Sequence, residues 1–358
     1  MKRTSCRTAG GPPVRASRVW LSAAAVASLL AVVVLASAGA KADEAGGPSR
    51  VARVFVLAGQ SNMEGQAVVD LDGPDYNEGR GTLATLLRDP AQAIRFAHLR
   101  DAAGRWQTRD RVFVSYRREN EPPLEGPLGI GYAVYGGRHH FGAELQFGHV
   151  VADHAARTDG RPILLVKTAW GGKSLDRDFR PPSAGSTTDS DGRVVSAPGP
   201  SYTRMIDDVR RALADVPRLV PGADRGELAG FVWWHGWNDG CDAAVAAPAY
   251  EANLACLIRD VRHDLDAAAL PVVIGELTGP WTDAPAAWDE VRRAQAAVAA
   301  RPEFAETVRF VATRDFVRRP EDSPNPGHGH HEFGNAETYL LVGDALGRAM
   351  VAALSDER

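Results

Sequence analysis

Hydrophobic residues in this chain gather in short runs that alternate with longer segments of helical periodicity. The short runs are rich in β-branched residues, as is typical of strands buried on both faces, and they cover residues 51–57, 162–168, 230–234, 271–277 and 308–313. Apolar positions with the spacing of amphipathic helices recur between or after them, over residues 142–157, 202–216, 250–265, 286–300 and 337–354. This alternation predicts an α/β fold in which helices cover both faces of a parallel sheet.

Two regions interrupt the alternation, and we interpret them as insertions in a single domain that spans residues 50–355. Residues 67–135 mix glycine, proline and charge with a possible strand pair at 94–99 and 111–117, whereas residues 173–201 are rich in Pro, Ser, Gly and Asp. Long loops in a compact domain are usually functional or disordered. Ligands bind at the carboxyl ends of parallel strands, so we expect the 173–201 loop, which leaves such an end, to contact substrate.

The first 42 residues have a different composition. Basic residues precede an apolar run at 20–36, and small residues follow at 36–38 and 40–42. This order predicts a cleaved export signal and a periplasmic or extracellular protein. An uncleaved anchor helix is the alternative, because the run approaches the length that spans a bilayer.

Charge limits the partners of the remaining chain. Without residues 1–42 it has 35 basic and 45 acidic residues, a net charge of about −10. A surface of that sign repels nucleic acid and anionic lipid, so we expect neither as a partner. Cys241 and Cys256 remain after signal removal. In an oxidising compartment they form either a disulfide or two free thiols, because spacing alone cannot supply the Cα separation.

Polar residues with the chemistry of acyl transfer follow the predicted strands. Ser61 comes after the first strand, paired glycines at 171–172 after the second, Asn238 after the third, and a histidine cluster at 328–331 precedes the last helix. Acyl transfer needs a nucleophile, a base and fixed donors for the oxyanion. Alone, Ser61 could equally be a helix N-cap; together, the four blocks supply each part.

These blocks resemble a known family. The stretches AGQSNM at 58–63, GAELQFG at 142–148 and GWND at 236–239 are similar to the SGNH hydrolase superfamily, and within it to the sialate O-acetylesterase-like group, the family 6 carbohydrate esterases. The resemblance covers about residues 51–352. It implies a flavodoxin-like three-layer α/β/α sandwich with about five central parallel strands. It also implies removal of acetyl groups from sugars without a metal or cofactor.

The resemblance assigns roles to particular residues. Ser61 matches the nucleophile. Its own N–H, the N–H of Gly172 (with Gly171 as the alternative) and the amide of Asn238 match the oxyanion-hole donors. His331 matches the base, because its spacing to the final helix fits the family pattern, and His330 is the second choice.

The third triad member is where the sequence departs from the family. His328 occupies the position of the usual aspartate, and Trp237 stands where related esterases carry a glutamate. Asp239 is the first choice for the acid that orients the histidine, with Asp322 and Glu332 as alternatives. We further expect Gln60 and two tryptophans, Trp170 and Trp237, to contact the sugar, and Trp233 to lie in the core.

The sequence therefore predicts a secreted serine esterase that removes O-acetyl groups from carbohydrate through an acetyl-serine intermediate, of the sialate O-acetylesterase or acetylxylan esterase type. A carbohydrate-binding protein of the same fold with little activity is an alternative, because the acid position is missing. A zinc protein is a less favoured one, with ligands His328, His330, His331 and either His139 or His140. Neither the acetylated sugar nor the oligomeric state can be read from the sequence.

Overall fold

The computed structural model describes residues 50–279 and 286–356. They belong to one compact unit, residues 46–358. The predicted export signal and its anchor alternative lie in residues 1–49, outside the described ranges. None of the helices within these ranges combines the length and apolar character that a bilayer crossing requires.

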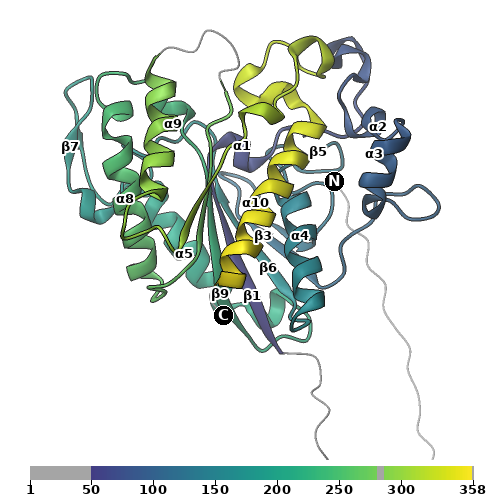
Figure 1. Ribbon diagram of the computed structural model, residues 1–358, viewed down its shortest axis with the longest axis horizontal. Helices are drawn as coiled ribbons and strands as arrows, with labels where there is room; N and C mark the ends of the chain where they lie inside the picture. The colour runs from purple at the N-terminus through teal and green to yellow at the C-terminus, as the bar shows by residue number, and fades with distance from the viewer. Residues whose placement is uncertain (1–49, 280–285, 357–358) are drawn as a thin grey trace, which may run out of the picture. The chain divides into compact units, whose positions relative to one another are not determined.

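Seven strands form one sheet in the order β11-β10-β9-β1-β6-β3-β4 (Figure 1). All neighbours run parallel except β4, which is antiparallel to β3 at one edge. The five predicted strands are confirmed as β1, β6, β9, β10 and β11, and β3 and β4 extend the sheet. The bounds are β1 Val51–Gly59, β3 Val112–Tyr116, β4 Leu124–Pro127, β6 Ile163–Ala169, β9 Arg225–Trp234, β10 Val272–Gly275 and β11 Val308–Val311.

The five predicted helices are also confirmed, and they cover both faces of the sheet (Figure 1). Side chains that alternate along β1 enter different cores. Val54 and Val56 pack with α5, α8 and α9, whereas Phe55 and Leu57 pack with α4 and α10. The predicted three-layer α/β/α sandwich is therefore correct, with helices α4 Glu144–Arg157, α5 Pro200–Ala214, α8 Ala246–Asp264, α9 Ala286–Ala299 and α10 Ala336–Asp356.

The insertion over residues 67–135 contains short helices where a strand pair was predicted. Residues 94–99 form the end of α3 and the whole of η2, with Phe96 between them, so the first strand of that pair is wrong. The Asp89 carboxylate accepts hydrogen bonds from the N–H groups of Ala91 and Gln92, and Pro90 occupies the first helical turn. This N-cap starts a helix. The second predicted strand exists as β3, and it pairs with β4 and β6.

The remaining elements are short. The first insertion and its surroundings contain β2 Ala67–Val68, η1 Pro74–Gly79, α2 Leu83–Leu86, α3 Pro90–Arg95, η2 Ala97–Leu99 and β5 His140–Phe141. The second contains η3 Pro182–Ala184, β7 Thr187–Thr188 and β8 Val194–Val195. The others are α1 Ser61–Glu64, α6 Val216–Leu219, α7 Trp237–Gly240, η4 Arg314–Phe316, η5 Pro320–Asp322 and η6 Gly329–Gly334.

The two remaining cysteines do not form the disulfide that the sequence left open. Cys241 at the end of α7 is exposed, Cys256 in α8 is half-buried, and both are free thiols. The alternative of two free thiols is the one that the structure has.

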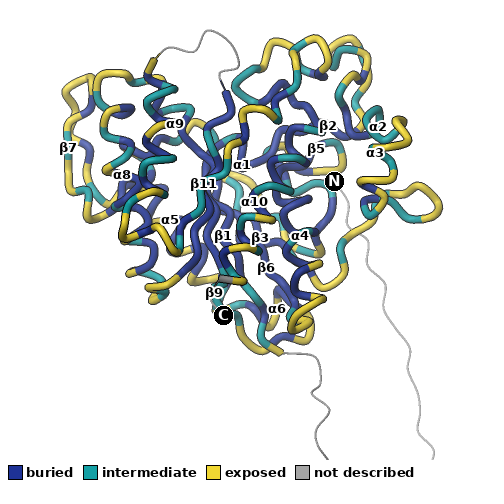
Figure 2. Tube along the Cα trace, in the orientation of Figure 1, coloured by how far each residue is buried: buried dark blue, intermediate teal, exposed yellow. Residues whose placement is uncertain are grey.

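The parallel register brings together, at the carboxyl ends of the strands, the turns that carry Ser61, the glycine pair at 171–172 and Asn238. Gly59 at the end of β1 pairs with Ala169 at the end of β6 and with Trp234 at the end of β9. Figure 2 shows the strands as a buried centre from which the turns emerge. The turns that follow these strands therefore start side by side, although they lie far apart in the sequence.

Candidate active site

The Ser61 turn starts where β1 can no longer continue. Gly59 lies so close to the end of β9 that a Cβ there would collide with the carbonyl oxygen of Trp234, so only glycine fits. The chain then enters α1, with Ser61 as its first residue and half-buried. The hydroxyl of Ser61 makes no hydrogen bond with any described residue, which leaves it available to a ligand.

Gln60 ties the Ser61 turn to the turn after β9. Its side chain is 3% exposed. The Oε1 atom accepts hydrogen bonds from the N–H groups of Gly236 and Trp237, both at 2.9 Å, and Nε2 donates to Oδ1 of Asn238 at 3.0 Å. Both ends of the Gln60 amide are therefore used inside the protein. The predicted substrate contact is wrong for Gln60, which instead positions Asn238.

This network also fixes the orientation of the Asn238 amide. Since Oε1 of Gln60 accepts from two backbone N–H groups, its NH₂ group must be the part that meets Asn238. Only the oxygen of Asn238 can accept from that NH₂ group. The NH₂ group of the half-buried Asn238 is consequently left free to donate elsewhere, as an oxyanion donor must.

Asn62 ties the other side of Ser61 to the histidine turn. Its Nδ2 atom donates to Oε1 of Glu332 at 2.9 Å, and its Oδ1 atom accepts from the hydroxyl of Tyr339 at 3.0 Å. Glu332 directly follows His331 in the chain. The two neighbours of Ser61 thus hold it between the Asn238 turn and the His331 turn.

Glu64 connects α1 to the glycine pair after β6. Its carboxylate accepts from the Tyr116 hydroxyl at 2.7 Å, and its Oε2 atom adjoins Gly171, where an added Cβ would approach it to 3.0 Å. A Cβ on Gly171 would lie 3.7 Å from the Cβ of Ser61, so the pair adjoins the serine. The N–H of Gly172 makes no hydrogen bond with any described residue, so it is available to a ligand. Gly172 is exposed with a φ of +73°.

A buried lysine, Lys167, supports this arrangement, and its role was not predicted from the sequence. The ammonium of Lys167 contacts Oε2 of Glu144 at 2.8 Å and the carbonyl oxygen of Glu64 at 2.6 Å. Lys167 and Glu144 are both completely buried. Burial lowers the pKa of Lys167 and raises the pKa of Glu64. The signal was a lysine inside an apolar strand, since a charge there requires a partner.

The predicted base lies in η6, whose backbone is strained. Glu332 and Phe333 have φ values of +52° and +57°, a region that side chains other than glycine rarely adopt. His331 is half-buried, and burial together with the nearby His330 and His328 lowers its pKa to about 4. The ring of His330 lies 4.1 Å from that of His331 and 5.8 Å from that of Trp237, between centroids. His330 is therefore on the Asn238 side of the turn.

His331 also lines a small cavity of about 170 Å³. Its other lining residues come from the segment after α1, from the 67–135 insertion, from β5 and from the turn before η6; they are Gln66, Tyr76, Tyr135, His140, Asn325 and His328. No residue of the 173–201 loop is among them. The expectation that the 173–201 loop lines the site gains no support from this cavity, which residues of the first insertion line instead.

The three candidates for the triad acid are engaged elsewhere. Both oxygens of Asp239 accept backbone N–H groups, from Leu175 and Asp176 at 2.9 Å, and the imidazole near it, at 3.8 Å, is His235. Asp322 pairs with Arg319, and Glu332 accepts from Asn62 and Thr278. Within residues 50–279 and 286–356, no carboxylate is hydrogen-bonded to His330 or His331. These contacts do not support the prediction that Asp239 orients His331; Asp239 instead holds the turn after Gly172.

The tryptophans differ in their exposure. Trp170 is 0% exposed, stacks on Phe179 at 5.8 Å and donates its Nε1–H to a backbone carbonyl. The prediction that Trp170 contacts the sugar is therefore wrong, because its ring points into the core. Trp233 is 0% exposed, which confirms its core position. Trp237 is half-buried beside Trp288 and His330, and its contact with a sugar stays a prediction.

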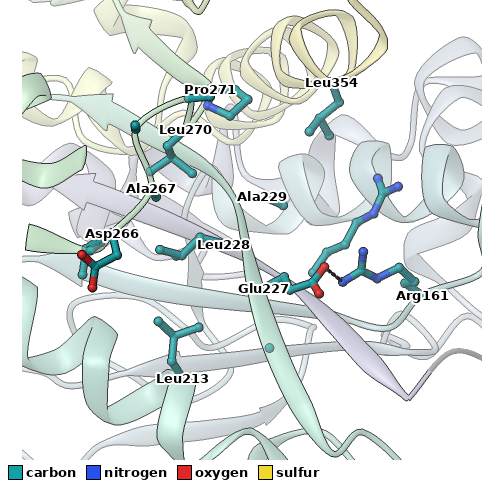
Figure 3. Close-up of a pocket in the computed structure, with 15 residues that line it drawn as sticks. Arg161, Leu213, Glu227, Leu228, Ala229, Asp266, Ala267, Leu270, Pro271 and Leu354 are labelled. Atoms are coloured by element: carbon teal, nitrogen blue, oxygen red, sulfur yellow. Dashed lines mark hydrogen bonds and ion pairs between the residues drawn. The ribbon is translucent and has the colours of Figure 1, made fainter. Parts of the chain in front are cut away.

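A larger cavity, of about 710 Å³, opens at the opposite end of the strands from Ser61 (Figure 3). It lies at the start of β9 and beside the loop from α8 to β10, with the Arg161–Glu227 ion pair on one side. Its described lining contains no serine, cysteine or histidine. Since ligands of parallel sheets bind at the carboxyl ends of the strands, this cavity is not the candidate active site.

Metal ligands do not converge in the part of the chain that the structure describes. No group of three or more His, Cys, Asp or Glu side chains is arranged there to hold an ion. The zinc alternative for the histidine cluster gains no support from this geometry.

Glu332 should make the protein less stable as pH rises. Burial raises its pKa to about 7. Between pH 4.5 and 7 the folded protein keeps a proton that the unfolded chain releases, so the free energy of unfolding falls by about 3 kcal/mol for this group. Urea unfolding at pH 5 and pH 7.5 measures the loss. Glu332→Gln should reduce the difference between the two pH values; an unchanged difference would contradict the assignment to Glu332.

Comparison with known proteins places the chain in a family. Residues 51–340 match the family described as "Carbohydrate esterase, sialic acid-specific acetylesterase". A comparison with curated proteins found no match.

Two solved structures share the fold, and a third is less similar. A protein of Arabidopsis thaliana is 17% identical with a TM-score of 0.51, over 84% of this chain and 98% of its own. The protein NanS is 15% identical with a TM-score of 0.51, over 87% of this chain and 100% of its own. A carbohydrate acetylesterase of Xanthomonas citri is 17% identical with a TM-score of 0.43, over 83% of this chain and 56% of its own. The family match covers most of the chain, so the chain belongs to the carbohydrate esterase family of sialic acid-specific acetylesterases and is a carbohydrate O-acetylesterase.

Proposed function

We propose that this protein is an exported serine esterase that removes O-acetyl groups from carbohydrate through an acetyl-serine intermediate. Ser61 is the nucleophile and His331 is the base. The observation that carries the proposal is the pair of hydrogen bonds on either side of Ser61. Gln60 binds the turn that holds Asn238, and Asn62 binds the residue after His331. Export rests on the pattern of residues 1–42.

The reaction follows from these positions. His331 takes the proton of the Ser61 hydroxyl, and the serine oxygen attacks the acetyl carbonyl. The tetrahedral intermediate then expels the sugar oxygen, which receives the proton from His331. A water molecule then attacks the acetyl-serine while His331 takes its proton. The second tetrahedral intermediate expels the serine oxygen, which receives that proton from His331, and acetate is released.

Three donors stabilise the oxyanion in this proposal. The N–H of Ser61 lies in the first turn of α1, where backbone amides have no intrahelical acceptor. The N–H of Gly172 has no hydrogen-bond partner among the described residues. The NH₂ group of Asn238 is turned away from Gln60. Donors fixed before the reaction stabilise the developing charge without reorganisation.

The pH profile tests the role of His331. Its pKa is lowered to about 4, chiefly by burial, so the imidazole is neutral and competent as a base above that value. As pH falls through about 4 it becomes protonated and kcat/KM should decline there, rather than near the ordinary histidine value of about 6.5. The measurement is kcat/KM for p-nitrophenyl acetate between pH 3.5 and 8, in the range where the fold is intact. A decline centred near 6.5 would contradict the assignment.

The experiment that tests the proposed function is release of acetate from O-acetylated carbohydrate by the purified protein, residues 43–358. Wild type should release acetate, and the Ser61→Ala variant should not. A folded wild-type protein that binds acetylated glycans without releasing acetate would overturn the proposal.

A further inference from the structure

The ammonium of Lys167 joins three segments of the chain that are distant in the sequence. It donates to the carbonyl oxygen of Glu64 at the end of α1, at 2.6 Å, and to that of Tyr132 between β4 and β5, at 2.5 Å. Its third contact is Oε2 of Glu144 at the start of α4, at 2.8 Å. An ammonium has three N–H donors, so these contacts use all of them. Lys167 therefore acts inside the protein and has no donor left for a substrate.

Helix α1, which begins at Ser61, depends on other segments for its direction. It has four residues, and a helix of one turn is not stable by itself in water. At its far end, the Glu64 carbonyl accepts from Lys167. The next carbonyl, that of Gly65, accepts from the N–H of Val134 at 3.3 Å. These two contacts fix the end of the helix opposite to Ser61, so they help to set the direction of the serine side chain.

The GAELQFG stretch at 142–148 supplies the negative charge of this arrangement. The Glu144 side chain is completely buried. Its Oε1 atom accepts from the N–H of Gly142 at 2.9 Å, while its Oε2 atom meets Lys167. Gly142 in turn touches the end of α1, because a Cβ added to Gly65 would lie 2.6 Å from the Cα of Gly142. The stretch therefore packs against the segment that carries Ser61.

Stability alone does not explain a buried ion pair at this place. Two charges lose their hydration when they are buried, and apolar side chains of similar size are often as stable or more stable. Burial lowers the pKa of Lys167, and the charge of Glu144 opposes that shift. An apolar pair could fill the same space, but it could not donate to the carbonyl groups of Glu64 and Tyr132. The function that requires the ammonium is the placement of these two carbonyl groups.

We propose that Lys167 is a positioning residue of the esterase. In this proposal, which rests on the function proposed for Ser61, the ammonium fixes the direction of α1 and so places the Ser61 hydroxyl for attack. Glu144 of the GAELQFG stretch balances the charge of the ammonium. Neither residue touches the substrate, and both act on the reaction through Ser61.

Covalent labelling by diisopropyl fluorophosphate tests the placement of Ser61. The serine oxygen bonds to phosphorus and fluoride leaves, so the intact mass of the protein reports one adduct per active molecule. The final extent of labelling counts the folded molecules, whereas the rate constant depends on how well the hydroxyl is placed. A role in stability alone changes the extent but not the rate constant. Wild type should be labelled once, and Ser61→Ala should not be labelled.

The double variant Lys167→Met with Glu144→Gln removes the ammonium and leaves no charge unpaired. It should unfold at a higher urea concentration than Lys167→Met alone, because the single variant buries the Glu144 charge without a partner. Its labelling rate constant should still be about 30-fold below that of wild type, since small displacements of reacting groups slow a reaction. Glu144→Gln alone keeps the donors of Lys167 and should stay within about threefold of the wild-type rate constant.

Arg53→Met with Asp159→Asn is the matched control. It removes an ion pair of 2.7 Å between β1 and the turn before β6, in which the arginine side chain is 13% exposed. This pair lies at the other end of the strands from Ser61, so the control should be labelled at the wild-type rate.

The outcomes separate this inference from the proposed function. A double variant that fails to fold, or that is labelled as fast as wild type, would show that the Lys167 pair serves stability and not placement. A control as slow as the double variant would also overturn the inference, because loss of any ion pair of the sheet would then have the same effect. If wild type itself is not labelled, the proposed function fails and the inference fails with it.

Discussion

Ser61→Ala is expected to lower kcat for acetate release by about 10⁵- to 10⁶-fold, the loss typical of removing the nucleophile of a serine hydrolase. The physical reason is that no acetyl-enzyme can form without the hydroxyl, and a fixed donor set alone gives only a small residual rate. Release of acetate from O-acetylated carbohydrate, followed under single-turnover and steady-state conditions, measures the effect.

The fold of this variant should be unaffected. The Ser61 hydroxyl has no hydrogen-bond partner among the described residues, so its removal leaves no buried group unsatisfied. Thermal unfolding should match that of wild type. Ser183→Ala, an exposed serine in η3, serves as the control and should keep full activity. Activity in Ser61→Ala within tenfold of wild type would refute the nucleophile assignment.

Gln60→Glu is expected to lower kcat by about 100-fold, although it changes one heavy atom of a side chain whose hydrogen bonds are all made inside the protein. At pH 7 a glutamate can still accept from the N–H groups of Gly236 and Trp237, but it cannot donate to Asn238. The Asn238 amide must then rotate to donate its NH₂ group to the carboxylate. Its oxygen would face the oxyanion, and loss of one oxyanion donor costs about 10²- to 10³-fold.

A double-mutant cycle with Asn238→Ala tests this reason. If Gln60 acts through Asn238, the double variant should be about as active as Asn238→Ala alone, because the two changes remove the same donor. Gln107→Glu, at an exposed position, is the matched control for the added charge. Additive losses in the double variant, or a Gln60→Glu variant within threefold of wild type, would show that Gln60 does not orient the donor.

The sheet and its helices could be predicted because their signals are local. Strand β1 has a continuous apolar run and α10 has helical periodicity, so each element is encoded within its own segment. The strand expected at 94–99 failed for an equally local reason, the Asp89 N-cap before Pro90, which that interpretation overlooked. The parallel pairing of the strands then placed Ser61, Gly172 and Asn238 together at the carboxyl ends of the strands.

The contacts inside the site could not be predicted in the same way. Gln60 and Asn238 are 178 residues apart, and Asn62 and Glu332 are 270 residues apart. No periodic pattern in the sequence indicates which polar side chains form hydrogen bonds across such separations. Asp239 illustrates the difficulty, since its place at a strand end indicated a triad acid, yet its oxygens hold the backbone of residues 175–176.

The sequence by itself determined the succession of strands and helices along the chain and the residue types at the strand ends. The reason is that hydrophobic periodicity and turn residues act over a few neighbouring positions. Only the tertiary structure decided which way each polar side chain faces. Trp170 turns into the core, Gln60 turns to Asn238, and the first insertion rather than the second meets His331. Those directions follow from packing and hydrogen bonds between segments that meet only when the chain has folded.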